Sequence, residues 1–225
     1  MSRTQTAAFF HVEGMLIRAG VLSCSAYLAA NRQRFRERLA RLFQVAATAP
    51  FSGVLRRHNR TLANRLLYWA FRGMSEDRVA ILGQEYFDEI LKEQLSSEAL
   101  NLVQKARKEG HRIVLVSEGI SFVVEALADY IKGVNHVLCN RLEFGNSVAT
   151  GRLLPPVVGG FETARAISQF ADEIGIDLSR SMAYAGQSSD LFFLSAVGKP
   201  CAVNPDFSLR QAAREANWPI LEHRA

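Results

Sequence analysis

Short runs of mostly apolar residues alternate along the chain with longer stretches in which apolar positions recur every three or four residues. Such runs are typical of strands buried on both faces of a sheet. We expect strands at residues 7–10, 113–116, 136–139, 182–185 and 201–203, and a small hairpin within 141–154. Strands that alternate with helices predict an α/β fold with a central parallel sheet, flanking helices and right-handed crossovers.

One long stretch departs from this alternation. Between residues 20 and 95 the apolar spacing is helical, as in the series Leu62, Leu66 and Trp69, and no strand pattern interrupts it. The stretch follows directly after the first predicted strand. We therefore predict an α/β core formed by residues 1–19 and 96–225, with an all-helical cap inserted at residues 20–95.

The charge pattern also separates the insert from the rest. The segment 32–72 holds ten arginines, no lysine and one acid, which is a net charge of +9. The other residues comprise 17 basic and 21 acidic side chains, so their net charge is −4. The arginines are either a solvated cap surface or an anion-binding face, for which Arg56, Arg57 and Arg60 are candidates. Phe35, Phe43 and Phe51 among them suit a membrane interface, but packing inside the cap suits them better.

Composition narrows the class of protein. The 225 residues are 48% hydrophobic and 22% charged, as in ordinary globular proteins. No apolar run reaches the roughly 18 to 20 residues of a membrane-spanning helix, and the first residues lack a signal peptide's apolar core. Three widely spaced cysteines predict reduced thiols and a cytoplasmic protein. No nucleic-acid-binding motif occurs, and the oligomeric state is not indicated.

Polar side chains follow several predicted strands directly. His11 and Glu13 come after the first strand, Ser117 after the second, and Gln187 and Asp190 after the fourth. In parallel sheets the ligand site lies beyond the carboxyl ends of the strands. We therefore expect these side chains to meet in one crevice, with the inserted cap above it.

Residues around these positions resemble the haloacid dehalogenase superfamily, in particular its phosphoserine-phosphatase-like branch (HAD-IB). The resemblance runs nearly end to end and is carried by residues 9–16, 114–117, 151–161, 184–191 and 197–206. It implies a Rossmann-like core with a helical cap and magnesium-dependent phosphotransfer. Its relatives include proteins linked to phospholipid acyl transfer as well as to small metabolites.

The resemblance also implies a role for each position of the site. His11 stands where the family has a nucleophilic Asp, and Glu13 where a second Asp acts as acid and base. Ser117 and the Lys position, here Thr163, would hold the phosphoryl oxygens. The carboxylates that bind magnesium belong at position 11, at Gln187 and at Asp190.

Most of these positions depart from the family pattern, and Glu118 adds an anion beside a phosphate site. Imidazole and amide groups replace two carboxylates, so a magnesium site would be weak. Without the lysine, a transferring phosphoryl group would also lose its main electrostatic stabilisation. We therefore predict a phosphatase-like pseudoenzyme without a cofactor, which binds a small phosphorylated or anionic ligand or a protein partner.

Alternatives remain from the sequence. His11, Glu13 and Asp190 could instead form a site for a softer metal. The chain could also be a hydrolase with an altered nucleophile or metal, in which Glu13 and Ser117 work and which uses magnesium if residual family chemistry persists. The arginine-rich cap could be a module for an anionic partner or a membrane surface. Ser117 and Asp190 could also be retained as helix caps, and His11 as a hydrogen-bonded histidine of an inactive pocket.

Overall fold

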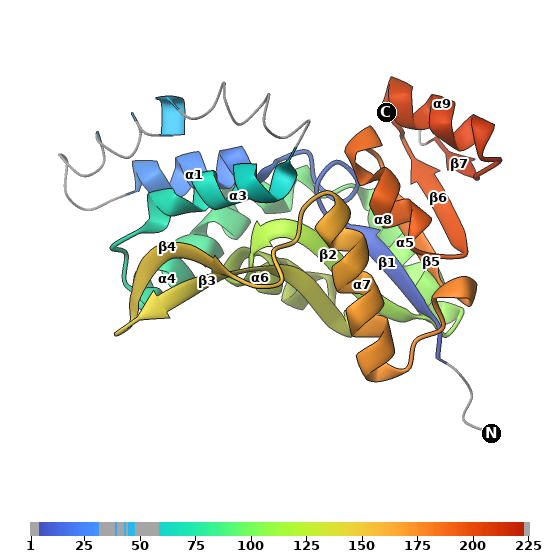
Figure 1. Ribbon diagram of the computed structural model, residues 1–225, viewed down its shortest axis with the longest axis horizontal. Coiled ribbons are helices and arrows are strands. Elements are labelled where there is room, and N and C mark those ends of the chain that lie inside the picture. Colours follow the sequence, from blue (N-terminus) through green and yellow to red (C-terminus); the bar gives the residue numbers. More distant parts are fainter. Residues whose placement is uncertain (1–4, 32–38, 40–42, 44, 48–58, 223–225) are drawn as a thin grey trace.

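The structure, a computed structural model, describes residues 5–31, 39, 43, 45–47 and 59–222. In this part of the chain one sheet has the order β4-β3-β2-β1-β5-β6-β7, and only β4 runs antiparallel to its neighbour (Figure 1). The strands are β1 (Ala7–His11), β2 (Arg112–Ile120), β3 (His136–Gly145), β4 (Val148–Leu154), β5 (Met182–Ala185), β6 (Lys199–Val203) and β7 (Ile220–Leu221). The predicted α/β class with a mostly parallel sheet is confirmed.

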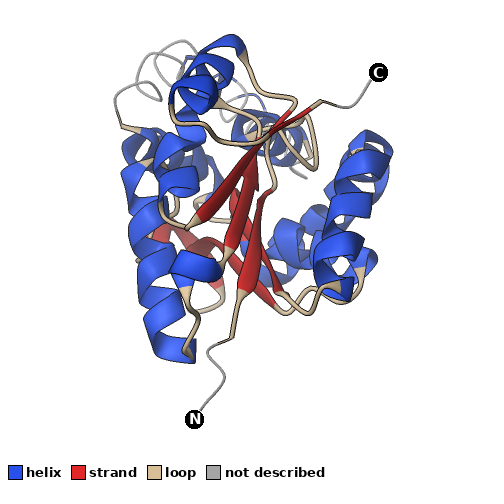
Figure 2. Ribbon diagram, turned by 90° about the vertical axis from the view of Figure 1, so that its right-hand side faces the viewer, coloured by secondary structure: helices blue, strands red, loops and turns tan. Residues whose placement is uncertain are grey.

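Helices cover both faces of the sheet (Figure 2). Because side chains alternate along a strand, Phe9 and Val114 face one layer while Phe10 and Leu115 face the other. The first layer contains α7 (Phe161–Ile174), α8 (Leu191–Ser195) and α9 (Phe207–Glu215). The second contains α5 (Ser97–Lys108) and α6 (Ser121–Ile131). All four strand side chains are fully buried, as their continuous apolar runs predicted.

The helices of the predicted cap lie beside the β3–β4 end of the sheet (Figure 1). They are α1 (Val21–Ala30), α3 (Arg60–Tyr68), α4 (Glu76–Tyr86) and the short turns Trp69–Phe71, Phe87–Leu91 and Lys92–Gln94. Leu28, Leu67 and Leu82 belong to the same hydrophobic core as Phe10 and Leu115. The cap helices therefore share a core with the sheet, and their separation as a domain at residues 20 and 95 stays a prediction.

Differences from the predicted elements lie at the edges of the sheet. The hairpin at 141–154 is present, but its first half extends β3, so β4 becomes the outermost strand. The two-residue strand β7 was not predicted, because its pattern is too short to distinguish from a turn. Short turns at Leu178–Arg180 and Ser188–Asp190 complete the described elements. Among the described residues, none of the helices is both long and apolar enough to span a bilayer.

Candidate functional site

The polar side chains at the strand ends meet in one buried cluster, as the topology predicted. His11 is the last residue of β1 and Glu13 comes two residues later, Glu118 lies near the end of β2, and Asp190 precedes α8. Their exposed fractions are 1%, 6%, 1% and 3%, respectively. Ionisable groups at such depth are costly unless they are paired, so the contacts of each one determine what the site can do.

The carboxylate of Glu13 accepts hydrogen bonds from the end of β2. Ser117 Oγ donates to Glu13 Oε1 over 2.6 Å, and the backbone amide of Gly119 donates to the same oxygen over 3.1 Å. The amide of Glu118 donates to Glu13 Oε2 over 3.3 Å. The pairing of β2 with β3 shifts register between Val116 and Ile120, in the stretch that contains these donors. We call this set of donors, the Ser117 hydroxyl and the amides of Glu118 and Gly119, the anion cradle.

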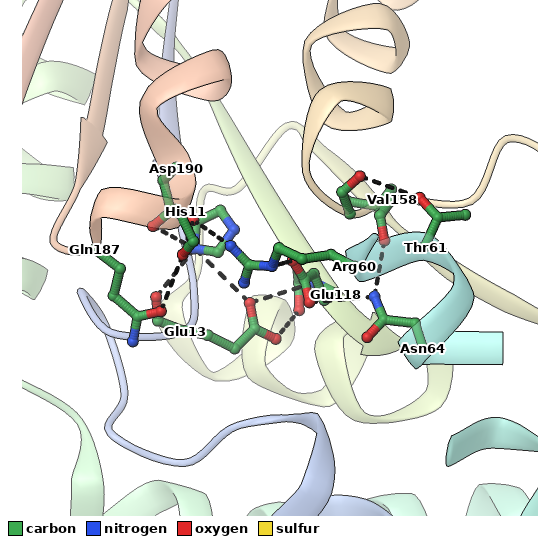
Figure 3. Close-up of polar contacts among 12 residues, drawn as sticks. His11, Glu13, Arg60, Thr61, Asn64, Glu118, Val158, Gln187 and Asp190 are labelled. Atoms are coloured by element: carbon green, nitrogen blue, oxygen red, sulfur yellow. Dashed lines mark hydrogen bonds and ion pairs between the residues drawn. The ribbon is translucent and has the colours of Figure 1, made fainter. Parts of the chain in front are cut away.

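Arg60 enters the same cluster from the cap (Figure 3). The side chain of Asn59 accepts a hydrogen bond from the amide of Leu62 and caps α3, so Arg60 is the first residue of that helix. Arg60 Nε lies 2.5 Å from Glu118 Oε1, and Nη1 donates to Asp190 Oδ1 over 3.0 Å. Burial alone would lower the pKa of Arg60, but Glu118 and Asp190 raise it, so the guanidinium stays charged.

This position corrects the grouping of Arg60 with the anion-binding candidates of the cap surface. Arg60 is only 7% exposed and is already paired with two carboxylates of the chain itself. Its proposed companions Arg56 and Arg57 lie outside the described residues.

Three more residues of α3 bond to the core. Asn64 Nδ2 donates to Glu118 Oε2 and to the carbonyl of Val158, each over 3.1 Å, and the Tyr68 hydroxyl donates to the Glu118 carbonyl over 2.7 Å. Thr61 Oγ1 donates to the carbonyl of Gly159 over 3.2 Å. A Cβ on Gly159 would lie 3.3 Å from the Thr61 nitrogen, so the absence of a side chain there permits the close approach of α3.

His11 is held in an acidic environment. Its Nδ1 lies 3.0 Å from the Glu13 carbonyl oxygen, which can only accept, so Nδ1 carries a proton. The same nitrogen lies 3.6 Å from Asp190 Oδ2 and 3.9 Å from Glu13 Oε2. Burial alone would lower the pKa of His11, but the carboxylates of Asp190 and Glu13 outweigh it and raise this pKa. The raised pKa favours the imidazolium, which has no lone pair with which to attack phosphorus.

The remaining sequence-derived positions lie around this cluster. Thr163 is buried in the first turn of α7, where its amide donates to the carbonyl of Gly160, and its role toward phosphate stays a prediction. Gln187 lies over Gly14, whose φ of +78° suits a glycine. Asp190 is the N-cap residue of α8 but makes no side-chain capping bond, and Ser117 donates to Glu13, so neither acts as the predicted helix cap.

A magnesium ion, which the family uses, does not fit this arrangement. The first-motif position offers an imidazole nitrogen that already carries a proton, and Gln187 offers an uncharged amide. Asp190 keeps its carboxylate, but Arg60 occupies one of its oxygens and His11 faces the other. In the described ranges, no set of three or more His, Cys, Asp and Glu side chains has a geometry that could hold a metal ion. The softer-metal alternative through His11, Glu13 and Asp190 therefore gains no support.

From the sequence, Arg60 was expected on an anion-binding face of the cap rather than in the buried cluster, and Asn64 was not recognised as a site residue. Periodicity predicts a helix here but does not show which face turns inward, and ten arginines in 41 residues conceal the one that is buried. A polar series at Arg60, Asn64 and Tyr68, spaced four residues apart, is the signal that could have indicated an inward polar face.

Comparisons with known proteins agree with this fold. A model of the haloacid dehalogenase-like hydrolase family matches residues 11–195. The chain belongs to this family. It is 30% identical over 222 residues to the phosphoserine phosphatase SerB1 of Mycobacterium tuberculosis H37Rv, covering 97% of this chain and 71% of that one. It is 32% identical over 154 residues to an inhibition of morphological differentiation protein of Streptomyces azureus, covering 68% of this chain and 55% of that one.

Solved structures show the same architecture. A Bordetella pertussis Tohama I protein of unknown function superimposes with a TM-score of 0.82 at 20% identity, over 97% of this chain and 98% of the other. A phosphoserine phosphatase carrying an analogue of its phospho-aspartyl intermediate superimposes with a TM-score of 0.69 at 13% identity. The superposition covers 99% of this chain and 95% of the phosphatase. These likenesses show that the chain shares the fold of both proteins.

Proposed function

We propose that this family member does not perform magnesium-dependent phosphotransfer and acts instead by binding a ligand or protein partner. The position of the Glu13 carboxylate is the observation that carries the proposal. It accepts hydrogen bonds from all three groups of the anion cradle. By family resemblance, this end of β2 is where a substrate phosphoryl group would be held, and a carboxylate already satisfies its donors.

The surrounding charges support the same conclusion. The nucleophile position is a histidine whose raised pKa favours the imidazolium, a form without the free electron pair that a nucleophile needs. Arg60 supplies a positive charge, but it is committed to Glu118 and Asp190. Close to the site, the cavity beside Glu13 and Ser117 has a volume of only about 20 Å³, enough for roughly one water molecule.

A ligand would then bind to surfaces beside the buried cluster of charged side chains. A groove of about 1030 Å³ lies between the start of α3, the start of α7 and the turn before α8. Arg60 and Gln187 form part of its floor, and the exposed rings of Phe161 and Phe192 contact each other edge to face along its side. A small ligand with a planar apolar part suits these walls.

The proposal is tested by turnover measurements with the purified chain. We expect no hydrolysis of a broad panel of phosphomonoesters in magnesium or manganese above the level of a His11→Ala, Glu13→Ala double variant. Turnover that depends on His11 or Glu13 would overturn the proposal. Elemental analysis of the purified protein gives an independent result, because stoichiometric zinc, manganese or iron would favour the alternative of a hydrolase with an altered metal.

A further inference from the structure

The outer face of α3 and of the turn after it is apolar. Leu62, Leu66 and Trp69 are 44%, 41% and 44% exposed, although large apolar side chains normally turn inward. Their spacing of four and three residues places them in one stripe along the helix. The inner face of the same helix buries Arg60 and Asn64, so the stripe faces away from the site.

A second described part of the cap also exposes apolar side chains. Leu39 and Phe43, one helical turn apart, are 52% and 77% exposed. Val45 on the same stretch is only 6% exposed and belongs to the hydrophobic core, so its neighbours point outward while it points inward. The prediction that Phe43 packs inside the cap is therefore wrong, and Phe35 and Phe51 lie outside the described residues.

Helix α3 and the turn after it carry only positive charge. Arg65 and Arg72 are exposed beside the stripe, and residues 59–75 contain no acidic side chain. The whole segment 32–72 carries a net charge of +9 in a chain whose other residues sum to −4. Any partner of this face must therefore tolerate protruding aliphatic and aromatic groups and also supply negative charge.

An anionic membrane surface meets both requirements. Leucine and phenylalanine side chains can enter the boundary of the acyl chains, tryptophan favours the headgroup level, and arginines extend to lipid phosphates. Basic segments near anionic lipids gain further attraction with each Lys or Arg. We propose that the outer face of α3, comprising Leu62, Arg65, Leu66, Trp69 and Arg72, binds peripherally to anionic membranes, and that the exposed Leu39 and Phe43 of the cap take part. This interaction is independent of the proposed lack of phosphotransfer.

Tryptophan fluorescence tests this contact directly, because the chain has two tryptophans and Trp218 can be replaced. In Trp218→Phe, Trp69 is the remaining reporter. Phosphatidylglycerol vesicles with brominated acyl chains should shift the Trp69 emission to the blue and quench it. Brominated phosphatidylcholine vesicles should do neither. In about 1 M salt, where the Debye length falls to about 3 Å, binding should weaken strongly.

Variants separate this face from the rest of the surface. Leu62→Ser with Leu66→Ser should weaken binding to phosphatidylglycerol vesicles by roughly tenfold or more, since each removes apolar area from the contact. Phe207→Ser is the matched control. Phe207 is 82% exposed on α9, a helix outside the predicted cap, so its replacement should leave vesicle affinity unchanged. Circular dichroism confirms that the variants are folded.

Several results would overturn the proposal. One is the absence of Trp69 quenching by brominated phosphatidylglycerol, and another is equal binding to phosphatidylcholine. Binding to polyglutamate without binding to vesicles would assign the face to an acidic protein. A dimer seen by light scattering that Leu62→Ser with Leu66→Ser dissociates would assign it to a second copy of the chain. Phosphomonoester turnover, which bears on the proposed lack of phosphotransfer, changes none of these readouts.

Discussion

Helices α3 and α5 both pack against the body of the protein, but they differ in which residues they bury. Helix α5 buries Ala99, Val103 and Ala106 and exposes charged side chains, as an amphipathic surface helix should. Helix α3 buries Arg60 and Asn64 alongside Ala63, Leu67 and Tyr68, and it exposes Leu62 and Leu66. Each deviation in α3 therefore needs an explanation that core packing alone does not give.

The two faces of α3 have different explanations. On the inner face, buried carboxylates compensate the buried polar groups, because Glu118 and Asp190 pair with Arg60 and Glu118 accepts from Asn64. On the outer face, nothing described covers the exposed leucines, which is what a binding surface requires. Polar residues on the buried face of a helix can thus indicate a site. Apolar residues on its exposed face can indicate a surface that binds a partner.

Removal of the Arg60 side chain should have the largest effect on stability. Arg60→Ala leaves Glu118 and Asp190 buried without their cation, so we expect the free energy of unfolding to fall by about 3–5 kcal/mol. Arg65→Ala on the exposed face of the same helix should change it by no more than about 0.5 kcal/mol. Urea denaturation measures both. Equal losses in the two variants would mean that the inner ion pairs do not stabilise the fold.

His11 should make stability depend on pH in a defined direction. Burial opposes its charge, but Asp190 and Glu13 raise its pKa above the ordinary value of 6.5. Its contribution is therefore complete below pH 6.5 and is lost as the pH rises through the raised folded-state pKa. The unfolding free energy of the wild type relative to His11→Gln should accordingly be largest in acid and shrink toward alkaline pH.

His136 provides a control of opposite sign. Burial and Arg112 lower its pKa, so its contribution to stability falls as the pH decreases through 6.5. Urea midpoints of the wild type, His11→Gln and His136→Gln across this range should therefore give slopes of opposite sign for the two histidines. A difference between the wild type and His11→Gln that does not change with pH would refute the assigned charge environment of His11.

The hydrogen bond from Tyr68 should contribute less than the ion pairs. Tyr68→Phe removes a buried donor to the Glu118 carbonyl, which Asn140 Nδ2 also bonds over 2.8 Å. Because the carbonyl keeps one partner, we expect a loss of about 0.5–1.5 kcal/mol in unfolding free energy. Tyr130→Phe, at a ring that is 46% exposed, should be close to neutral. A loss of the size expected for Arg60→Ala would show that Tyr68 does more than donate one bond.

The outer face of α3 should matter least for folding. Leu62→Ser and Leu66→Ser should each change the unfolding free energy by no more than about 0.5 kcal/mol, since both side chains are already largely in water. Leu67→Ala is the control, because Leu67 is 1% exposed and its truncation should cost about 2–5 kcal/mol. Thermal or urea unfolding distinguishes the two cases. Similar losses at Leu66 and Leu67 would place the stripe in the core rather than at a binding surface.

The fold could be predicted from the sequence because buried parallel strands leave an unambiguous pattern. The apolar run at 113–116 and the polar residues after it located β2 and one wall of the site. By family resemblance, His11, Glu13 and Gln187 also predicted a changed centre. Each of these inferences rests on local sequence, so long-range packing was not needed for them.

The side-chain contacts inside the site could not be predicted in the same way. It depends on the face that α3 turns inward, and the spacing of Leu62, Leu66 and Leu67 is compatible with either face. Glu13 could equally have been a catalytic carboxylate, because only the placement of Ser117 and the following amides shows what it contacts. These arrangements arise from tertiary contacts over about 50 to 100 residues of separation.

Titration calorimetry with inorganic phosphate tests most directly whether Glu13 fills the anion cradle. We expect no measurable heat of binding with the wild type, but binding to Glu13→Ala, in which Ser117 and the amides of Glu118 and Gly119 are released. Glu13→Gln, which keeps the shape and an acceptor oxygen, should behave like the wild type. Equal affinity for phosphate in the wild type and Glu13→Ala would contradict the account.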